Sequence, residues 1–336
     1  MNLNKKVLVV GSSGFIGSNL VKEALYQGYN VHAGVRKSSN LQLLPRDGIQ
    51  LVEFDLSSPV QIKSVLQDFA VQNEHFDFII YNAGITYARK TNDFIDVNFQ
   101  NTKNFTTALK ESGMQFRKFL FVSSLSAFGP GDASFTPIEV SHPKNPISTY
   151  GKSKLMAEKH IASLNNFPHL IINPTAVYGP GDKDFLKFIS LVTSGFEFHL
   201  GRSKQMLSMI YVKDLVRVMI QLLESRFVNR SYLVSDLAEY DRERLVEVIK
   251  SILNKKTIKI RFPAPVIKAG VHFADSIYNL FGSKPFLNAE KLAEMTTPNW
   301  LCNAAETWKH ANSQPAYSLE KGMKETIDWY KENSWL

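Results

Sequence analysis

The fold of this chain is decided near its start, where residues 7–17 read Val-Leu-Val-Val-Gly-Ser-Ser-Gly-Phe-Ile-Gly. The apolar run predicts a buried strand, and a helical pattern begins directly after it. One glycine in such a turn permits the sharp bend, one lets the backbone approach a pyrophosphate, and one lets the helix pack closely on the strand. N–H groups at the helix start attract phosphates. The spacing GxxGxxG after a first strand predicts a dinucleotide site at Gly11, Ser13, Gly14, Phe15, Ile16 and Gly17.

Outward from this turn, apolar runs alternate with helix-length stretches through the first half of the chain. The runs are rich in Val, Ile and Phe and show almost no polar alternation, which is typical of strands buried on both faces of a parallel sheet. We therefore predict an α/β fold with a doubly wound, Rossmann-type parallel sheet. The predicted strands are 6–10, 31–35, 50–54, 76–81, 118–123 and 169–173, and the predicted helices include 14–27, 59–72, 94–112 and 149–164.

The alternation of apolar runs and helix-length stretches ends at about Thr175, after which the predicted segments are shorter and of more mixed type. This predicts a dinucleotide-binding domain over residues 1–175 and a smaller C-terminal substrate-binding lobe over 176–336. The boundary is not sharp, because a segment near 207–218 has the apolar character to return to the main sheet.

Composition narrows the functional class. The chain has 336 residues, of which 44% are hydrophobic and 21% charged, as in globular proteins. Lys and Arg exceed Asp and Glu by 39 to 31, a net charge of +8. The cations are dispersed, so no nucleic-acid partner is predicted. The excess indicates either an unspecialised basic surface or an anionic ligand such as a phosphorylated cofactor.

The cysteine and histidine content and the N-terminal sequence bear on the compartment of the protein and on metal binding. Cys302 is the single cysteine, so no internal disulfide can form, and the N-terminus has no signal-peptide pattern. A cytoplasmic location is predicted. The apolar stretch 263–281 is interrupted by Lys268, His272 and Asp275, which favours an amphipathic helix over a membrane span. The eight histidines show no metal-binding spacing.

The end of the second strand predicts the type of cofactor. An acidic residue there would accept the ribose hydroxyls of NAD, whereas an arginine suits the 2′-phosphate of NADP. Arg36 and Lys37 follow this strand, so NADP is preferred and NAD is the alternative; both cations can also be plain surface residues. Asp55, followed by Leu56, is predicted to accept from the adenine amino group, or else to cap the helix near Pro59.

Tyr150 and Lys154 are four residues apart at the start of a helical stretch, so they share one helix face. A neighbouring ammonium lowers the pKa of a tyrosine, which makes Tyr150 a candidate general acid/base. Lys154 is also placed to bind the nicotinamide ribose. The pattern alone is common and often represents a solvated pair.

Strand ends add further candidates, since ligands of parallel sheets lie beyond the carboxyl ends of the strands. Ser124 follows the fifth strand and can hydrogen-bond the reacting oxygen, although Ser123, Ser124 and Ser126 can also serve as strand-end caps. Asn98 lies in a helix, where its amide can hold a carbonyl or a water, or be an ordinary polar residue. The wall of the cofactor site is predicted from Asn82, Ala83 and Gly84 at the end of the fourth strand.

These motifs resemble those of the short-chain dehydrogenase/reductase superfamily, in its extended branch of NAD-dependent epimerases and dehydratases. The resemblance implies that Tyr150 is the acid/base, that Lys154 holds the ribose and that Ser124 polarises the substrate oxygen during hydride transfer at the nicotinamide. It also implies a homodimer formed through the helices that carry Asn98 and Tyr150. The matching residues are Gly11, Gly14, Gly17, Asp55, Leu56, Asn82, Ala83, Gly84, Asn98, Ser124, Tyr150, Lys154, the run 173–180 and the C-terminal 315–330. Within the run 173–180, Asn173 and Thr175 are implied cofactor contacts. Ser126, Phe128 and Tyr178 are implied substrate contacts.

Departures from the family pattern bear on the substrate. Leu207 stands where nucleotide-sugar enzymes of the family carry a diphosphate-binding arginine, and Asn173 and Phe128 also replace usual residues. We therefore expect an oxidoreductase acting on an alcohol or ketone of a small uncharged molecule, as in the dihydroflavonol reductase and hydroxysteroid dehydrogenase branch. A nucleotide-sugar epimerase/dehydratase is the alternative, because Arg202 and Lys204 can meet a phosphate. A non-catalytic dinucleotide sensor is a third possibility, but such proteins tend to lose the tyrosine or the lysine.

Overall fold

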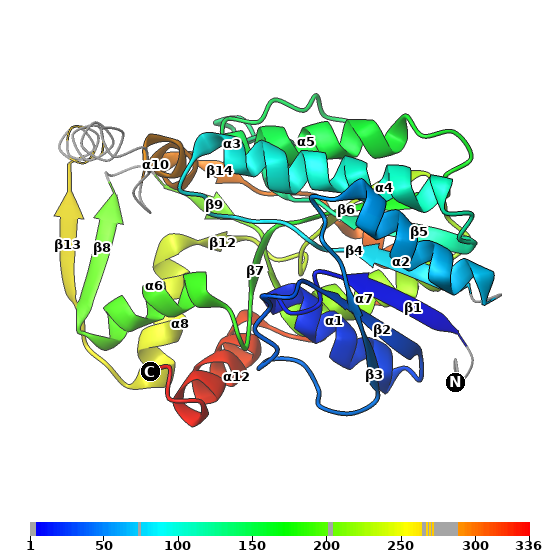
Figure 1. The fold of residues 1–336 in the computed structure, drawn as a ribbon. Helices are drawn as coiled ribbons and strands as arrows, with labels where there is room; N and C mark the ends of the chain where they lie inside the picture. Colours follow the sequence, from blue (N-terminus) through cyan, green and yellow to red (C-terminus); the bar gives the residue numbers. More distant parts are fainter. Residues whose placement is uncertain are drawn as a thin grey trace.

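A seven-stranded parallel sheet forms the centre of the molecule (Figure 1). The computed structural model describes residues 5–72, 75–200, 204–263, 267, 269, 271 and 288–336. The strands are β1 (Lys6–Val10), β2 (Asn30–Val35), β3 (Ile49–Glu53), β4 (Phe76–Tyr81), β5 (Phe116–Val122), β6 (His169–Pro174) and β11 (Arg230–Val234). Their order is β11-β6-β5-β4-β1-β2-β3. Strands β1 to β3 are added toward one edge of the sheet and β4 onward toward the other, so the strand order reverses between β1 and β4. The doubly wound sheet is thereby confirmed, and ligands of such sheets bind at this reversal.

Both faces of the sheet are covered by helices, and alternate residues of each strand serve separate cores. Val7 and Val9 of β1 belong to one core, and Leu8 and Val10 belong to the other. This double burial is why the strands lack polar alternation. Helices α1 (Phe15–Tyr26) and α7 (Val212–Glu224) contact each other on one face. The other face carries α2 (Pro59–Val71), α4 (Asn101–Glu111) and α5 (Thr149–Ala162). The short α3 (Thr91–Phe94) and the π-helical η1 (Ile95–Gln100) lead into α4.

The second half of the chain builds a smaller lobe beside the carboxyl ends of the strands (Figure 1). Of the strands that the structure describes in this half, only β11 returns to the main sheet, where it pairs with β6. The sequence left open whether the segment 207–218 returns to the main sheet. It does not pair with that sheet: it forms part of β9 (Met206–Leu207), then β10 (Met209–Tyr211) and the start of α7. The lobe contains α6 (Lys183–Thr193), α8 (Arg242–Leu253), α10 (Ala289–Thr296), α11 (Ala305–His310), α12 (Leu319–Glu332), β7 (Ala176–Tyr178), β8 (Phe196–Leu200), β9 (Met206–Leu207), β10 (Met209–Tyr211), β12 (Tyr240–Asp241), β13 (Ile258–Phe262) and β14 (Asn299–Trp300).

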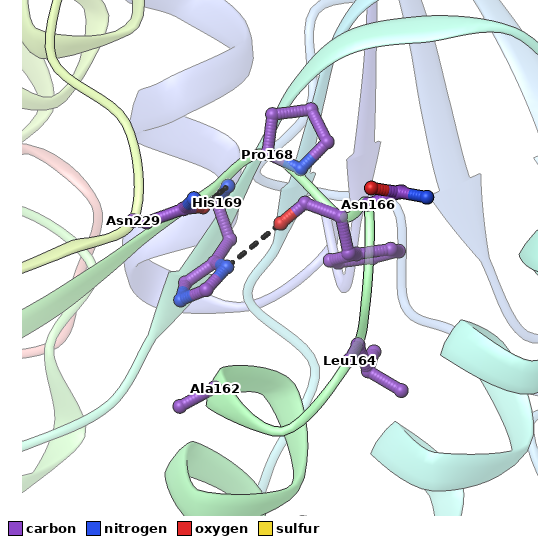
Figure 2. A pocket seen from close by; sticks show the side chains of 7 residues that line it. Ala162, Leu164, Asn166, Pro168, His169 and Asn229 are labelled. Carbon is purple, nitrogen blue, oxygen red and sulfur yellow. Dashed lines mark hydrogen bonds between the residues drawn. The ribbon is translucent and has the colours of Figure 1, made fainter.

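A hollow of about 460 Å³ lies at the amino end of β6 (Figure 2). Its lining includes His169, whose Nδ1 lies 2.8 Å from the carbonyl oxygen of Phe167. Burial lowers the pKa of this imidazole, which favours its neutral form. Because ligands of a doubly wound sheet bind at the carboxyl ends of the strands, this hollow is not where the active site is expected.

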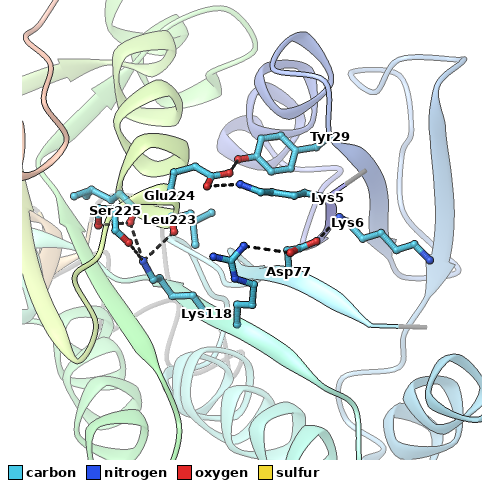
Figure 3. A network of polar contacts seen from close by, with 10 residues as sticks. Lys5, Lys6, Tyr29, Asp77, Lys118, Leu223, Glu224 and Ser225 are labelled. Atoms are coloured by element: carbon cyan, nitrogen blue, oxygen red, sulfur yellow. Dashed lines mark hydrogen bonds and ion pairs between the residues drawn. The ribbon is translucent and has the colours of Figure 1, made fainter. Parts of the chain in front are cut away.

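The last turn of α7 is fixed to the amino edge of the sheet by a polar network (Figure 3). Glu224 accepts from the Lys5 ammonium at 2.6 Å and from the Tyr29 hydroxyl. Lys118 of β5 places its ammonium at the carboxyl end of the helix, where a cation is favoured. This ammonium donates to three backbone carbonyls, those of Leu222 (3.2 Å), Leu223 (2.9 Å) and Ser225 (2.7 Å).

Two predictions concern segments that the structure describes little or not at all. Most of the expected amphipathic helix over 263–281 lies outside the described residues, and so does Arg202. Within the described ranges, none of the helices combines the length and the apolar character that crossing a bilayer requires.

Candidate active site

The three glycines of the turn between β1 and α1 have different surroundings and therefore different roles. Gly11 has a φ of +82°, and a Cβ on it would lie 2.7 Å from the backbone of Ala83. A Cβ on Gly17 would lie 2.1 Å from the Gly11 carbonyl oxygen, so this glycine lets α1 pack against the turn. Gly14 is exposed, and a Cβ there would make only an ordinary 3.7 Å contact. Its small size is therefore not required by the protein itself, and it leaves room for a ligand.

The helix start fits a bound pyrophosphate. Gly14 is the N-cap of α1 and has no side chain to accept from the first N–H groups of the helix. Ser12 is fully buried and ties the turn to β2 through its hydroxyl, which donates to the Gly34 carbonyl at 3.0 Å. Asn82 closes the other side, with its amide 3.4 Å from the Gly11 carbonyl oxygen. A rigid turn with unspent N–H groups is the arrangement that holds dinucleotide phosphates.

The residues expected around the adenosine lie at the ends of β2 and β3. Arg36 is exposed, and its backbone N–H donates to the Ser39 hydroxyl oxygen at 3.0 Å. Asp55 is also exposed and accepts from the hydroxyl of Ser57 at 2.6 Å and from its N–H at 3.0 Å, and these bonds lower the pKa of its carboxyl. The cap of α2 is Ser58, not Asp55. Leu56 is buried in the core, and its carbonyl accepts from the Asn104 amide at 3.1 Å.

Tyr150 lies in the first turn of α5, half-buried, with the ring of Phe94 at 6.1 Å between centroids. The Ser124 hydroxyl is near enough to the phenol to favour its ionised form, so the end of β5 and the first turn of α5 lie together. Burial raises the pKa of Tyr150 to about 12; Ser124 opposes this rise, and the carboxylate of Glu294 adds to it. Without a ligand, this tyrosine is therefore a protonated acid at neutral pH.

Lys154 lies one turn further along α5 and is only 5% exposed. Its ammonium donates to the Val122 carbonyl at 2.8 Å and lies 5.0 Å from the ring centre of Phe121. Burial lowers the pKa of Lys154 to about 8, while the nearby carboxylate of Glu158 favours the charged form. Tyr150 and Lys154 of α5 and Ser124 after β5 therefore lie together at the end of this strand.

Asn98 connects the loop after β4 to the catalytic helix from within η1. Its amide oxygen accepts from the Ile85 N–H at 2.8 Å, and its amide nitrogen donates to the Ile85 carbonyl and the Ser153 hydroxyl, both at 3.0 Å. A Cβ on Gly84 would lie 2.9 Å from the Asn98 amide oxygen and 3.2 Å from the Lys154 ammonium. Asn98 is fully buried, so it shapes the site through these contacts.

A buried polar cluster behind the site includes residues that the sequence did not single out. Glu158 is 3% exposed and accepts from the Ser123 hydroxyl, the Lys144 ammonium and the Asn173 amide. The same amide of Asn173 donates to the Ser124 carbonyl at 3.1 Å, so the cluster holds the segment that carries Ser124. Glu158 could have been found from its spacing, because it lies four residues after Lys154 on the same helix face.

The remaining predicted residues differ in what they contact. The N–H and hydroxyl of Thr175 both donate to the Val234 carbonyl at 3.1 Å, which ties β6 to β11. Ser126 is half-buried beside Ser124, whose hydroxyl oxygen accepts its N–H at 3.2 Å. Phe128 is 3% exposed, with the Lys144 ammonium 4.2 Å from its ring centre.

Tyr178 is not brought to the site. Its side chain is fully buried in a core shared with one face of the main sheet, between the rings of Tyr211 and Phe185 at 5.5 and 5.8 Å. A Cβ on Gly322 of α12 would lie 2.7 Å from the phenol oxygen. Tyr178 therefore packs the core, whereas the resemblance implied a substrate contact. The reason is that α12 packs closely against its phenol and leaves no room for a ligand on that side.

The geometry defines a class of protein. A glycine turn with free N–H groups lies at the reversal point of a parallel sheet, and the neighbouring strand ends bring together a tyrosine, a lysine and a serine. These are the parts of an enzyme that moves a proton at an alcohol or carbonyl oxygen while a bound nicotinamide exchanges a hydride.

Comparison with known proteins gives the family. Residues 7–235 match the model of the NAD dependent epimerase/dehydratase family, and the chain belongs to this family. Among its relatives, the UDP-glucose 4-epimerase of Vibrio cholerae is 26% identical, with 96% of this chain and 94% of the relative covered. The ceramide reductase of Caulobacter vibrioides is 23% identical, with 98% and 96% covered. The extended short-chain dehydrogenase/reductase resemblance is confirmed, and the chain is an enzyme of an NAD-dependent family.

Solved structures share the whole fold. The UDP-glucose 4-epimerase of Thermotoga maritima, solved with UDP-glucose, superposes with a TM-score of 0.78 at 18% identity, covering 98% of this chain and 99% of the other. A UDP-glucuronic acid 4-epimerase of Bacillus cereus, solved with UDP-glucuronic acid and NAD, gives 0.75 at 20% identity with 98% and 99% covered. At these identities the likeness establishes the fold of both lobes.

Proposed function

We propose that this enzyme oxidises an alcohol carbon of a nucleotide sugar and returns the hydride to the same carbon, as an epimerase does. The observation that carries the proposal is the meeting of Ser124, Tyr150 and Lys154 at the end of β5. Similar proteins whose names or bound ligands are UDP-sugars match this chain over nearly its whole length. They support a nucleotide sugar as the substrate over the small uncharged molecule expected from the sequence.

The residues at the site fit a nicotinamide dinucleotide. The exposed Gly14 and the uncapped first turn of α1 would hold its pyrophosphate, and Lys154 would hold its ribose. When bound, the dinucleotide accepts and returns a hydride. Tyr150 removes the proton from the substrate hydroxyl as the alcohol is oxidised and gives it back as the carbonyl is reduced. Ser124 holds the substrate oxygen, and the Lys154 ammonium stabilises the phenolate that takes up this proton and is restored when the carbonyl is reduced.

The epimerase reaction is tested by product analysis. The enzyme is incubated with NADP⁺ or NAD⁺ and each of a set of UDP-hexoses, and the sugars are separated by chromatography while absorbance is followed at the nicotinamide band. An epimer that appears without net reduction of the dinucleotide supports the proposal. Stoichiometric reduction without an epimer contradicts it and identifies a dehydrogenase.

A second candidate is an oxidoreductase acting on an uncharged alcohol or ketone. The apolar Leu207 on β9 and the buried Phe128 favour it, because neither side chain can pair with a diphosphate. The ceramide reductase relative also supports it. Net consumption of reduced dinucleotide with a ketone panel, and none with UDP-sugars, would establish this candidate. A non-catalytic sensor would show neither activity and would be indifferent to Tyr150→Phe.

For the cofactor we propose NADP in preference to NAD. The exposed Arg36 directly after β2 supports this choice, since a guanidinium pairs with the 2′-phosphate. Solved structures of similar fold hold NAD, so the preference needs a direct test. Calorimetric titration is expected to show NADPH binding at least about tenfold more tightly than NADH. Arg36→Ala should remove the difference and Lys37→Ala should not; equal affinities in the wild type would contradict the proposal.

We propose a homodimer formed through α4 and α5, in the cytoplasm. Met156 on α5 is 38% exposed, which supports an apolar contact on this face. The single, buried Cys302 supports a reducing compartment. Light scattering on the purified protein should give twice the mass of one chain, and Met156→Glu should give the single-chain mass. A monomeric wild type would contradict the dimer, and recovery of the enzyme from a secreted fraction would contradict the location.

A further inference from the structure

Arg242, the first residue of α8, is a cation on the inward face of its helix. The residues three and four positions further on, Leu245 and Val246, share this face and are only 5% and 4% exposed. Arg242 itself is half-buried, and burial lowers the pKa of its guanidinium. Arg244, by contrast, is exposed and lies 2.5 Å from the carboxylate of Glu320. The guanidinium of Arg242 is therefore partly removed from water, unlike that of Arg244.

Within the part of the chain that the structure describes, the Arg242 guanidinium has no hydrogen-bond acceptor and no carboxylate in an ion pair. Half-buried cations elsewhere do have a partner, since Arg217 lies 2.6 Å from Asp214. Lys250 likewise lies 3.2 Å from Glu197. Arg242 is also at the amino end of its helix, where the helix dipole disfavours a positive charge. A desolvated, unpaired cation in this position lowers the stability of the free protein, so contacts within the chain do not explain it.

Helix α10 and strand β14 of the second lobe lie beside the first turn of α5. Glu294 of α10 accepts from the Ser148 hydroxyl at 2.6 Å. Glu290, one turn earlier, accepts from the Thr149 hydroxyl at 2.7 Å. The Trp300 indole of β14 donates to the Glu294 carbonyl at 3.0 Å, so β14 is joined to α10. The second lobe therefore contacts the turn that carries the catalytic tyrosine through these two elements.

Arg242 lies across one small sheet from this contact. The sheet has the order β12-β9-β14, and β12 leads directly into α8 (Figure 1). Neighbouring strands lie about 4.8 Å apart, so β12 is about 10 Å from β14. In a nucleotide sugar the diphosphate is joined directly to the sugar that reacts. A site for the diphosphate is therefore expected a short way from the catalytic residues, as the start of α8 is.

We propose that Arg242 binds the diphosphate of the substrate. A guanidinium donates two parallel hydrogen bonds to a phosphate, and this pairing supplies the negative partner that Arg242 lacks among the described residues. The inference rests on the proposed function in that the substrate is a nucleotide sugar. It adds the residue that recognises the anionic part of that substrate.

Binding of UDP tests the inference without turnover. UDP is titrated calorimetrically into the protein saturated with its dinucleotide, so that the β1–α1 turn is already occupied. Arg242→Gln removes the charge and should weaken UDP binding at least roughly tenfold, as expected for the loss of a charged hydrogen bond to phosphate. Arg244→Gln is the matched control, because it removes one positive charge from the same turn of α8, and it should keep the wild-type affinity. Uridine, which has no diphosphate, should bind equally to all three proteins.

The outcomes separate the inference from the proposed function. Equal UDP affinity in the wild type and Arg242→Gln, an equal loss in Arg244→Gln, or an equal loss for uridine would overturn the inference. If the wild type does not bind UDP, inorganic pyrophosphate takes its place in the titration. Pyrophosphate binding that depends on Arg242 would support the diphosphate site and contradict a UDP-sugar as the substrate. A wild type that binds neither would overturn the inference.

Thermal unfolding gives a second measure that needs no ligand. Because Arg242→Gln removes a partly desolvated charge, its melting temperature without ligand should equal or exceed that of the wild type. A clearly lower melting temperature would show that the chain itself stabilises the guanidinium, and would overturn the inference.

Discussion

The proposed chemistry depends on Tyr150, whose hydroxyl lies where the end of β5 meets the first turn of α5, beside Ser124 and Lys154. Tyr150→Phe removes this hydroxyl and leaves the ring packed against Phe94. We expect turnover to fall by about 10²–10⁴-fold, the usual contribution of a general acid/base. Dinucleotide binding, measured by calorimetry, should be unchanged; full activity in this variant would exclude Tyr150 as the acid/base.

Lys154 predicts how stability depends on pH. Burial lowers its pKa from 10.5 to about 8, so between these values the unfolded chain holds one proton more than the folded chain at this site. The free energy of unfolding contributed by this site therefore rises with pH across that window. Urea unfolding of the wild type and of Lys154→Met should show the wild type gaining stability relative to the variant from neutral pH to about pH 10. A constant difference would contradict the burial of a charged lysine.

At the scale of elements, the β1–α1 turn predicts different outcomes for two glycines. Gly17→Ala would bring its Cβ to 2.1 Å from the Gly11 carbonyl oxygen, so α1 must move and the melting temperature should fall sharply. Gly14→Ala meets only an ordinary contact at 3.7 Å, so the fold should be kept while dinucleotide affinity falls. Thermal melts and titrations of both variants check this pair. Equal behaviour of the two would contradict the separate roles.

The buried cluster on α5 predicts a strong coupling between Lys144 and Glu158. Lys144→Met leaves a carboxylate that is 3% exposed without its ammonium partner. Such a loss costs about 3 kcal/mol of the free energy of unfolding. The double variant Lys144→Met/Glu158→Gln should recover most of this loss in urea unfolding. A double variant that is less stable than Lys144→Met would show that the charge pair is not the cause.

The elements of the first half were predictable because local pattern and burial agree there. Runs buried on both faces have no polar alternation, and the predicted β1 and β4 match the observed bounds. The segment 207–218 was not predictable in the same way, because its apolar residues pack in one core with β1, β5 and β6 but form no strand of the main sheet. The π-helical turn at Asn98 also has no local signal, since it depends on the Asn98 contacts with Ile85 and Ser153.

At the scale of the whole molecule, the site joins two lobes. The first lobe supplies the residues that sequence motifs reveal, Ser124, Tyr150 and Lys154. The second lobe supplies Glu290 and Glu294, which no motif reveals because they lie about 140 residues from the turn that they hold. Tyr178 shows the reverse case, in which a motif residue packs the core. Motifs thus reveal the residues at the strand ends, whereas contacts between distant segments hold the turn that carries Tyr150.

Dinucleotide binding is the most direct test of the account, since every proposed step takes place on a bound nicotinamide. The purified wild-type protein is titrated calorimetrically with NAD⁺, NADH, NADP⁺ and NADPH, beside Gly14→Ala. The account predicts that the wild type binds at least one of the four and that Gly14→Ala, still folded, binds it more weakly. A correctly folded wild type that binds none of them would contradict the account.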